Sequence, residues 1–291
     1  MQDLTTLETI IIAIVEGLTE FLPVSSTGHM IITQKLLGVE STPFIHAFDF
    51  IIQFGAILSV VCLYWKRFFQ LDNSPAPTGA SAFGRLKHKF NFYWLLLVGV
   101  IPAVVIGLAA KKSGLLSWLL DSVWAVAIML IVGGIFMLFC DRMIEGKTSE
   151  ANKVTERRAF NVGLFQCIAV IPGVSRSMAT IVGGMTQGLT RKAAAEFSFF
   201  LAVPTMAGAT LLELIGLVED MRQNSEWVNT GNIMMLLLGC AVAFIVAFLA
   251  MKWFVAFVSK YGFRAFGIYR IIVGTALLVM LLSGQSLVMV D

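Results

Sequence analysis

The sequence has few charged residues. Asp, Glu, Lys and Arg make up 13% of its 291 residues, whereas about 25% is usual for a soluble domain. Hydrophobic residues account for 58%, and the mean hydropathy is +0.85. So few charges cannot cover a surface that faces water on all sides. The composition therefore excludes a soluble globular protein and predicts an integral membrane protein.

Paired cysteines and a basic N-terminal segment are also missing. The four cysteines, Cys62, Cys140, Cys167 and Cys240, all lie in apolar stretches and form no Cys-x-x-Cys pair, so a metal or disulfide role is not expected. The first eight residues contain no Lys or Arg, so a cleavable signal peptide is not expected either. The basic residues are scattered along the chain and predict no nucleic-acid partner.

Six apolar stretches are long enough to cross a membrane as helices, which takes roughly 20 residues. They are 45–65, 91–110, 122–140, 195–217, 230–251 and 265–283. Two further apolar stretches, 9–37 and 159–189, are interrupted by PVSSTG (23–28) and PGVSRS (172–177). Each half is too short to span, so each stretch is predicted to be a re-entrant helical hairpin, a backbone form that must be buried in protein or water.

The distribution of Lys and Arg predicts the orientation. Fifteen of them fall in the predicted loops 66–89, 141–158, 191–192 and 252–264, whereas the opposite face has mainly Lys111, Lys112 and Arg222. The first face is therefore predicted to be cytoplasmic. Both termini then lie on the outer side, and the first hairpin opens there while the second enters from the cytoplasm.

Short sequence matches indicate an internal repeat. They occur in the same order in both halves: GLTE (17–20) with GLFQ (163–166), Pro23 with Pro172, VSST (24–27) with VSRS (174–177), and IVG (131–133) with IVG (272–274). We predict one membrane domain over 1–291, with half one at about 1–140, a cytoplasmic linker at 141–158 and half two at about 159–291. Each half has a hairpin and three spans, and an odd number of spans inverts the second half. Inverted repeats with broken helices usually place their site near the membrane midplane, where the two breaks meet.

Two carboxylates, Glu16 and Glu20, lie four residues apart and so share one face of the first half-helix. In a low-dielectric setting two such groups repel, so one holds a proton or a cation lies between them. Mg²⁺ and Ca²⁺ prefer oxygen ligands of this kind. The alternative is a polar helix face packed against another span.

Hydroxyl groups follow at the first break. Ser25, Ser26 and Thr27 open the second half-helix, whose N–H groups and positive dipole end suit a phosphate, although Ser and Thr also serve as plain helix caps. His29 can face the same way as Ser26 and transfer a proton. The alternative for His29 is a structural histidine that donates to a carbonyl.

Arg176 lies at the matching break of the second half. A guanidinium at membrane depth needs an anion, which is either a substrate phosphate or the carboxylate of Glu16 or Glu20. Asp49, Glu196 and Arg270 are weaker candidates, and Arg270 is expected to pair with one of the other two. Gln53 lies one turn after Asp49 and is expected to line the same cavity.

These motifs resemble a known family. The segment EGLTEFLPVSSTGH (16–29) is similar to the first signature of the bacterial undecaprenyl-pyrophosphate phosphatases, the bacitracin-resistance proteins, and PGVSRS (172–177) is similar to the second. EFSF (196–199) and the order of the spans fit as well. Residues 178–180 are Met-Ala-Thr where Gly-Ala-Thr is common in the family.

The resemblance implies a hydrolase of the bacterial cytoplasmic (inner) membrane. Such an enzyme removes one phosphate from the C55 isoprenyl pyrophosphate, needs a divalent cation such as Mg²⁺ or Ca²⁺, and opens to the outer side. Homodimerisation is left open, and membrane lipid is an expected partner.

Each candidate residue then has an expected role. The catalytic set is Glu20, Ser26, His29 and Arg176, the substrate-binding set is Ser25, Thr27, Gln53, Ser175 and Ser177, and the metal ligands are Glu16 and Glu20. Ser26 is the candidate nucleophile, with direct attack by water as the alternative. Because inverted repeats with broken helices are typical of carriers, a lipid-phosphate transporter is the rival function.

Overall fold

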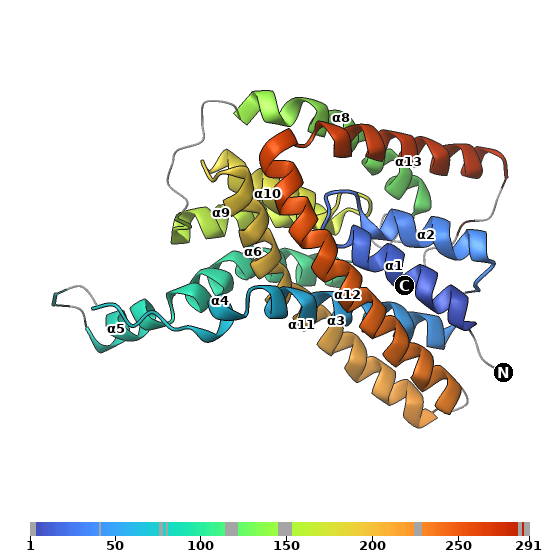
Figure 1. Cartoon of the computed structure of the whole chain (residues 1–291), viewed down its shortest axis with the longest axis horizontal. Coiled ribbons are helices and arrows are strands. Elements are labelled where there is room, and N and C mark those ends of the chain that lie inside the picture. The colour runs from blue at the N-terminus through green and yellow to red at the C-terminus, as the bar shows by residue number, and fades with distance from the viewer. Residues whose placement is uncertain are drawn as a thin grey trace.

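The computed structural model describes residues 4–40, 42–75, 78–79, 81–113, 122–144, 153–223, 229–284 and 287, without the side chains of 111–113, 143–144, 209 and 212–223. Within these ranges every regular element is a helix (Figure 1). The helices are α1 (Thr6–Thr19), α2 (Ser26–Leu37), α3 (Pro43–Leu63), α4 (Trp65–Phe69), α5 (Ala82–Lys89), α6 (Asn91–Ser113), α8 (Val123–Ile144), α9 (Glu156–Gln166), the 3-10 turn η1 (Cys167–Val170), α10 (Arg176–Thr186), α11 (Arg191–Gln223), α12 (Thr230–Tyr261) and α13 (Arg264–Leu282).

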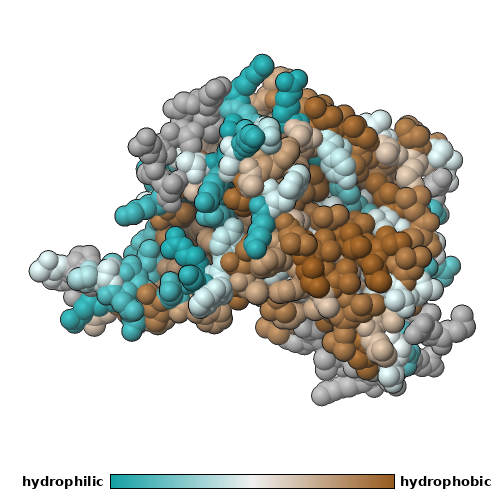
Figure 2. Space-filling model, in the orientation of Figure 1, coloured by the Kyte–Doolittle hydropathy of each residue, from teal (hydrophilic) through white to brown (hydrophobic). Residues whose placement is uncertain are grey.

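Five helices have the length and apolarity needed to cross a membrane: α3, α6, α8, α12 and α13. They confirm five of the six predicted stretches. The sixth, 195–217, falls within α11, whose side chains beyond Leu211 lie outside the described residues. Figure 2 shows a broad apolar surface on the right and a hydrophilic surface on the left. Among its apolar side chains, α12 exposes Leu237, Ile245 and Leu249. The chain is therefore a multi-pass helical membrane protein.

Both predicted interruptions are real helix breaks. The first separates α1 from α2, and the second separates α9 and η1 from α10. Among the described residues other than glycine, Ser25 (φ 69°) and Ser175 (φ 76°) are the two with positive φ. This conformation is costly for a residue with a Cβ and occurs where the surrounding structure enforces it, often at functional sites.

Some helix ends differ from the predictions. Residues 252–264 were expected to form a loop, but α12 continues to Tyr261. Likewise, most of α4 and all of α5 fall within the segment 66–89. The Lys87 side chain on α5 ion-pairs with Glu156 at the start of α9, which lowers the pKa of the Glu156 carboxyl. Hydropathy marks where a helix meets lipid, whereas the backbone continues as a helix wherever side chains permit it.

The helices of the two sequence halves interleave. α1 packs on α12 while α9 packs on α6, and α8 packs along α13. Glycines allow the close approach: a Cβ on Gly17 would lie 2.8 Å from the carbonyl oxygen of Ala243, and one on Gly163 would overlap the carbonyl of Gly99. Because α1 and α9 are anchored in the same way, both breaks lie inside the helix bundle.

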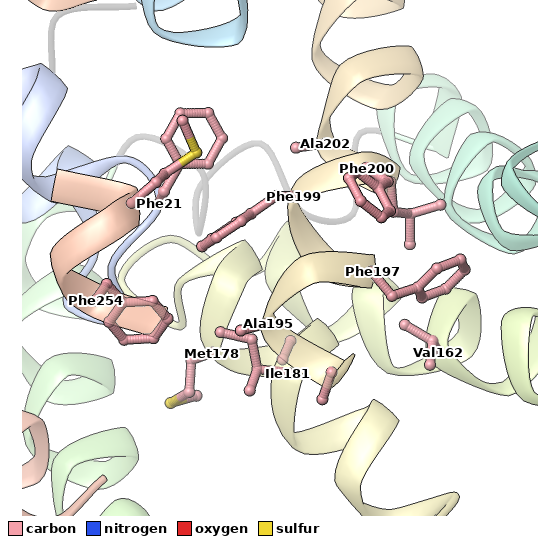
Figure 3. Packing of buried hydrophobic residues seen from close by; sticks show 14 of the residues in the cluster. Phe21, Val162, Met178, Ile181, Ala195, Phe197, Phe199, Phe200, Ala202 and Phe254 are labelled. Carbon is pink, nitrogen blue, oxygen red and sulfur yellow. The ribbon is translucent and has the colours of Figure 1, made fainter. Parts of the chain in front are cut away.

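A cluster of buried aromatic rings supports the first break (Figure 3). The Phe21 ring, directly after Glu20 in the chain, meets the Phe199 ring of α11 edge to face at 5.5 Å. Phe199 in turn lies 6.1 Å from the Phe254 ring of α12. All three side chains are fully buried, so the backbone that carries Glu20 is held firmly in place.

Candidate active site

Glu20 joins the two breaks. Its Oε2 accepts a hydrogen bond of 2.6 Å from the Ser26 hydroxyl, and its Oε1 accepts one of 3.0 Å from Arg176 Nη2. Ser26 is the first residue of α2 and Arg176 the first residue of α10, and Glu20 caps the C-terminus of α1. The structure thus brings together three of the four predicted catalytic residues, which are up to 156 positions apart in the sequence.

Two polar atoms at this centre have no partner. Arg176 Nη1 and Glu16 Oε1 are buried and, among the described residues, neither makes a hydrogen bond. A buried unpaired donor or acceptor is destabilising by about 1–3 kcal/mol, and more if it is charged. Such atoms are expected where a bound ligand completes the hydrogen bonding. Here Arg176 Nη1 can donate to an anion, and Glu16 Oε1 can bind a cation or a proton.

A pocket of about 170 Å³ opens beside this centre. It is lined by Glu16, Ser26, Thr27, Met30, Ile31, Gln34, His46, Asp49, Phe50 and Gln53. The Asp49 carboxylate accepts two hydrogen bonds from Gln34 Nε2, at 2.9 and 3.2 Å. Glu16, Ser26, Thr27 and Gln53, which the sequence analysis assigned to the site, therefore line one pocket.

The start of α2 is suited to binding an anion. The Ser25 side chain makes no capping hydrogen bond in the described structure, whereas Ser175, its counterpart at α10, accepts one from the Met178 N–H at 3.3 Å. The first-turn N–H groups of α2 thus lack a side-chain cap, and such groups bind phosphate oxygens readily. Ser25 serves α2 through its backbone conformation rather than through its hydroxyl.

The hydrogen bonds of the His29 ring go to residues other than Ser26. Its Nδ1 lies 2.8 Å from the Ser25 carbonyl oxygen, and its Nε2 lies 2.7 Å from the Tyr269 hydroxyl, against whose ring it stacks. A carbonyl only accepts, so Nδ1 carries the proton and Nε2 of a neutral ring accepts from Tyr269. This arrangement matches the structural alternative, a histidine donating to a carbonyl, and holds Ser25 in place.

Ser175 and Ser177 connect the two breaks to each other. The Ser177 hydroxyl donates to the Leu22 carbonyl at 2.7 Å and lies 2.9 Å from the Ser175 hydroxyl. Ser177 is almost fully buried. Both serines were predicted to bind substrate. In the structure they lie beside the backbone of the first break, and neither is among the residues that line the pocket.

Arg270 was expected to pair with Asp49 or Glu196, and that expectation is wrong. Its guanidinium is fully buried and donates to five backbone carbonyls instead. The acceptors are Pro23 (3.2 Å), Leu130 (3.4 Å), Met129 (3.0 Å), Gly173 (2.8 Å) and Val174 (3.1 Å). Arg270 thus ties both breaks and α8 together.

The comparisons with known proteins point to one family. The family model described as bacitracin resistance protein BacA matches residues 9–276. An undecaprenyl-diphosphatase of Porphyromonas gingivalis is 52% identical, covering 98% of this chain and 99% of the relative. Those of Bdellovibrio bacteriovorus (47%, covering 98% and 99%) and Flavobacterium psychrophilum (49%, covering 94% of each) carry the same name.

The chain belongs to the BacA family. The match includes both broken hairpins, α3 and the part of α13 that carries Arg270. The sequence resemblance drawn from 16–29 and 172–177 is thereby confirmed.

A metal site in this BacA-family chain can be tested against its side chains. Among the described residues, no group of three or more His, Cys, Asp or Glu side chains is placed to hold a metal ion. Glu16 nevertheless fits a cation, because its Oε1 is unpartnered and the side chain lines the pocket together with Asp49. Both oxygens of Glu20 are already engaged by Ser26 and Arg176, so Glu20 fits a cation less well.

Sequence reasoning missed the role of Arg270 in this family member. The signal that was available is an arginine in the apolar part of its helix, with no acidic residue within one turn. In lipid such a side chain must find acceptors, and loops interrupted by proline and glycine supply free carbonyls.

Proposed function

We propose that this chain is an undecaprenyl-diphosphatase. It hydrolyses the C55 isoprenyl diphosphate to the monophosphate and inorganic phosphate, which returns the lipid carrier to cell-wall synthesis and confers bacitracin resistance. The observation that carries the proposal is Glu20, held between the Ser26 hydroxyl and the Arg176 guanidinium where two helix breaks meet. The shared name of the relatives supports the same activity.

Substrate binding follows from the free groups of the pocket. The terminal phosphate is bound by the unpartnered Arg176 Nη1 and by the first-turn N–H groups of α2, while Thr27 and Gln53 contact it from the pocket wall. The prenyl tail leaves the pocket along the apolar outer faces of the helices. Phosphoryl transfer is catalysed largely by positioning and by neutralising oxygens, and these groups are suited to both tasks.

The chemical step begins at Ser26. Its Oγ attacks the terminal phosphorus, its proton passes to Glu20 Oε2, and the bond from phosphorus to the bridging oxygen breaks, releasing the lipid monophosphate. Water then hydrolyses the phosphoserine. Arg176 stabilises the charge that develops on the phosphoryl oxygens. In the alternative route, water attacks directly and Ser26 only orients it.

A divalent cation, Mg²⁺ or Ca²⁺, is part of the proposal. Glu16 would hold it, with Asp49 on the same pocket wall. The ion would neutralise the charge of the diphosphate oxygens.

The proposed setting is the bacterial cytoplasmic membrane. Six spans and two re-entrant hairpins form two inverted halves, with the pocket and both termini on the outer side. Two observations support the halves: the positive φ at Ser25 and Ser175, and the equivalent packing of α1 on α12 and α9 on α6. In Figure 1 the start of α1 and the end of α13 lie on the same side of the bundle.

Phosphate release from undecaprenyl diphosphate by the purified chain in detergent tests this function. We expect metal-dependent release that EDTA abolishes, and a loss of at least about a hundredfold in Glu20→Gln, because the amide cannot take the Ser26 proton. Reconstituted vesicles report movement of labelled lipid in parallel. Lipid movement without phosphate release under any cation would instead establish the transporter.

Ser26→Ala separates the two routes of attack. If Ser26 is the nucleophile, kcat falls by at least about a thousandfold, and acid-quenched wild type carries a phosphate on Ser26 that mass spectrometry detects. The matched control is Ser59→Ala, which removes a buried hydroxyl that donates to the Ala56 carbonyl of its own helix. A Ser26→Ala enzyme with nearly normal turnover assigns the attack to water.

A further inference from the structure

A second, larger pocket lies at the other end of the molecule. Its volume is about 520 Å³, and it is enclosed by α4, the start of α6, the start of α11 and the segment 153–154. Helix α3 separates it from the active-site pocket: about 20 Å of helix lie between Asp49 in the active site and Leu63 before α4. In Figure 1, α4 and α5 are on the left and α2 is on the right.

The rim of this pocket is basic. Four cations line it against two carboxylates, Asp72 and Glu196, which leaves an excess of two positive charges. The cations are Lys66, Arg67, Lys89 and Lys153. Within the described part of the chain none of the four lies within ion-pair distance of a carboxylate, and Asp72 is engaged by the N–H and hydroxyl of Ser74.

The floor of the pocket is aromatic. The Phe92 and Phe200 rings meet edge to face at 5.3 Å, and Phe197 is nearly fully buried beside them. Outside the rim, Trp65 and Phe69 are exposed on the same short helix as Lys66 and Arg67. Exposed aromatics beside cations are typical of the membrane–water interface, so the mouth of the pocket lies at headgroup level.

We propose that this pocket binds the phosphate of an anionic membrane lipid. The shared chemistry is a phosphate group recognised by several Lys and Arg side chains, and the aromatic floor accommodates the apolar part that follows it. By the orientation predicted from the Lys and Arg distribution, this is the cytoplasmic leaflet, opposite to the active site. The pocket is independent of the diphosphatase chemistry, since it shares no lining residue with the catalytic pocket.

Native mass spectrometry of the full chain in detergent tests the proposal with dioleoyl phosphatidylglycerol and dioleoyl phosphatidylcholine as probes. We expect tighter binding of the anionic lipid, by at least about fivefold, since each basic residue near such a headgroup contributes about that factor. The preference should disappear in the site variant K66Q/R67Q/K89Q/K153Q. It should persist in a charge-matched variant on the same face of the protein, R157Q/K252Q/K260Q/R264Q.

Further variants and probes decide the remaining outcomes. Equal losses in both glutamine variants, or no loss in the site variant, would overturn the proposal. If the site variant is not monodisperse, the two smaller variants K66Q/K89Q and R67Q/K153Q replace it. A weaker preference in both supports the proposal, and an unchanged preference in both would overturn it. Displacement of the lipid by micromolar inorganic phosphate would assign the pocket to free phosphate instead, whereas resistance to millimolar phosphate supports a lipid headgroup.

Discussion

Replacing Arg176 with alanine is expected to lower kcat for undecaprenyl diphosphate hydrolysis by about a thousandfold or more, the effect typical of an arginine that stabilises a phosphoryl transition state. The two terminal nitrogens of Arg176 differ: Nη2 donates to Glu20 at 3.0 Å, whereas Nη1 is buried and has no partner among the residues that the structure describes. Alanine removes the positive charge beside the transferring phosphate and leaves Glu20 without its counter-ion. Phosphate release at saturating substrate measures the loss.

The control for this prediction is Arg191→Ala. Arg191 also begins a helix and ion-pairs with a carboxylate, Asp141, at 2.8 Å, but it lies at the start of α11, away from the pocket. Arg191→Ala should leave kcat within about twofold of the wild-type value, as is usual for a substitution at the protein surface. Arg176→Lys keeps the positive charge but lacks the planar guanidinium, so its kcat should lie between those of Arg176→Ala and the wild type. Undiminished turnover of Arg176→Ala would remove Arg176 from the mechanism.

Arg270→Ala is expected to have the largest effect on stability. Five carbonyls lose their donor, and three of them, those of Pro23, Gly173 and Val174, belong to the breaks that form the site. Removing one partner of a buried charged network typically destabilises by about 3 kcal/mol or more. For a chain of this size that corresponds to a fall in Tm of roughly 6 °C or more, measured by thermal unfolding in detergent.

Arg264→Ala is the matched control on the same helix. Arg264 is exposed at the first residue of α13, so its loss should change stability by less than about 0.5 kcal/mol. The ammonium group in Arg270→Lys offers three N–H donors from a single nitrogen, which cannot reach five acceptors. We therefore expect a Tm between those of Arg270→Ala and the wild type. A wild-type Tm and activity for Arg270→Ala would show that the breaks hold their shape without it.

Which helices form, and where they break, follows from local sequence. Stretches of about 20 apolar residues predict α3, α6, α8, α12 and α13, because a lipid environment satisfies the backbone only within a helix. PVSSTG and PGVSRS predict the interruptions, because proline removes a donor and small residues permit unusual backbone angles. The start of α12 at Thr230 was predicted, but its extension to Tyr261 was not, since apolarity reports contact with lipid rather than helix length.

The sequence by itself also determined the family and the chemical groups of the site, because two motifs carry Glu20, Ser26 and Arg176 in fixed local order. Only the tertiary structure decided which groups meet. It paired Ser26 with Glu20 rather than with His29, because α1 ends just before the break and turns its last carboxylate toward α2. It also directed Arg270 to carbonyls rather than to Asp49, because an arginine fully buried between two broken helices meets unpaired backbone oxygens first. Sequence spacing carries no information on contacts made 96 to 247 residues apart.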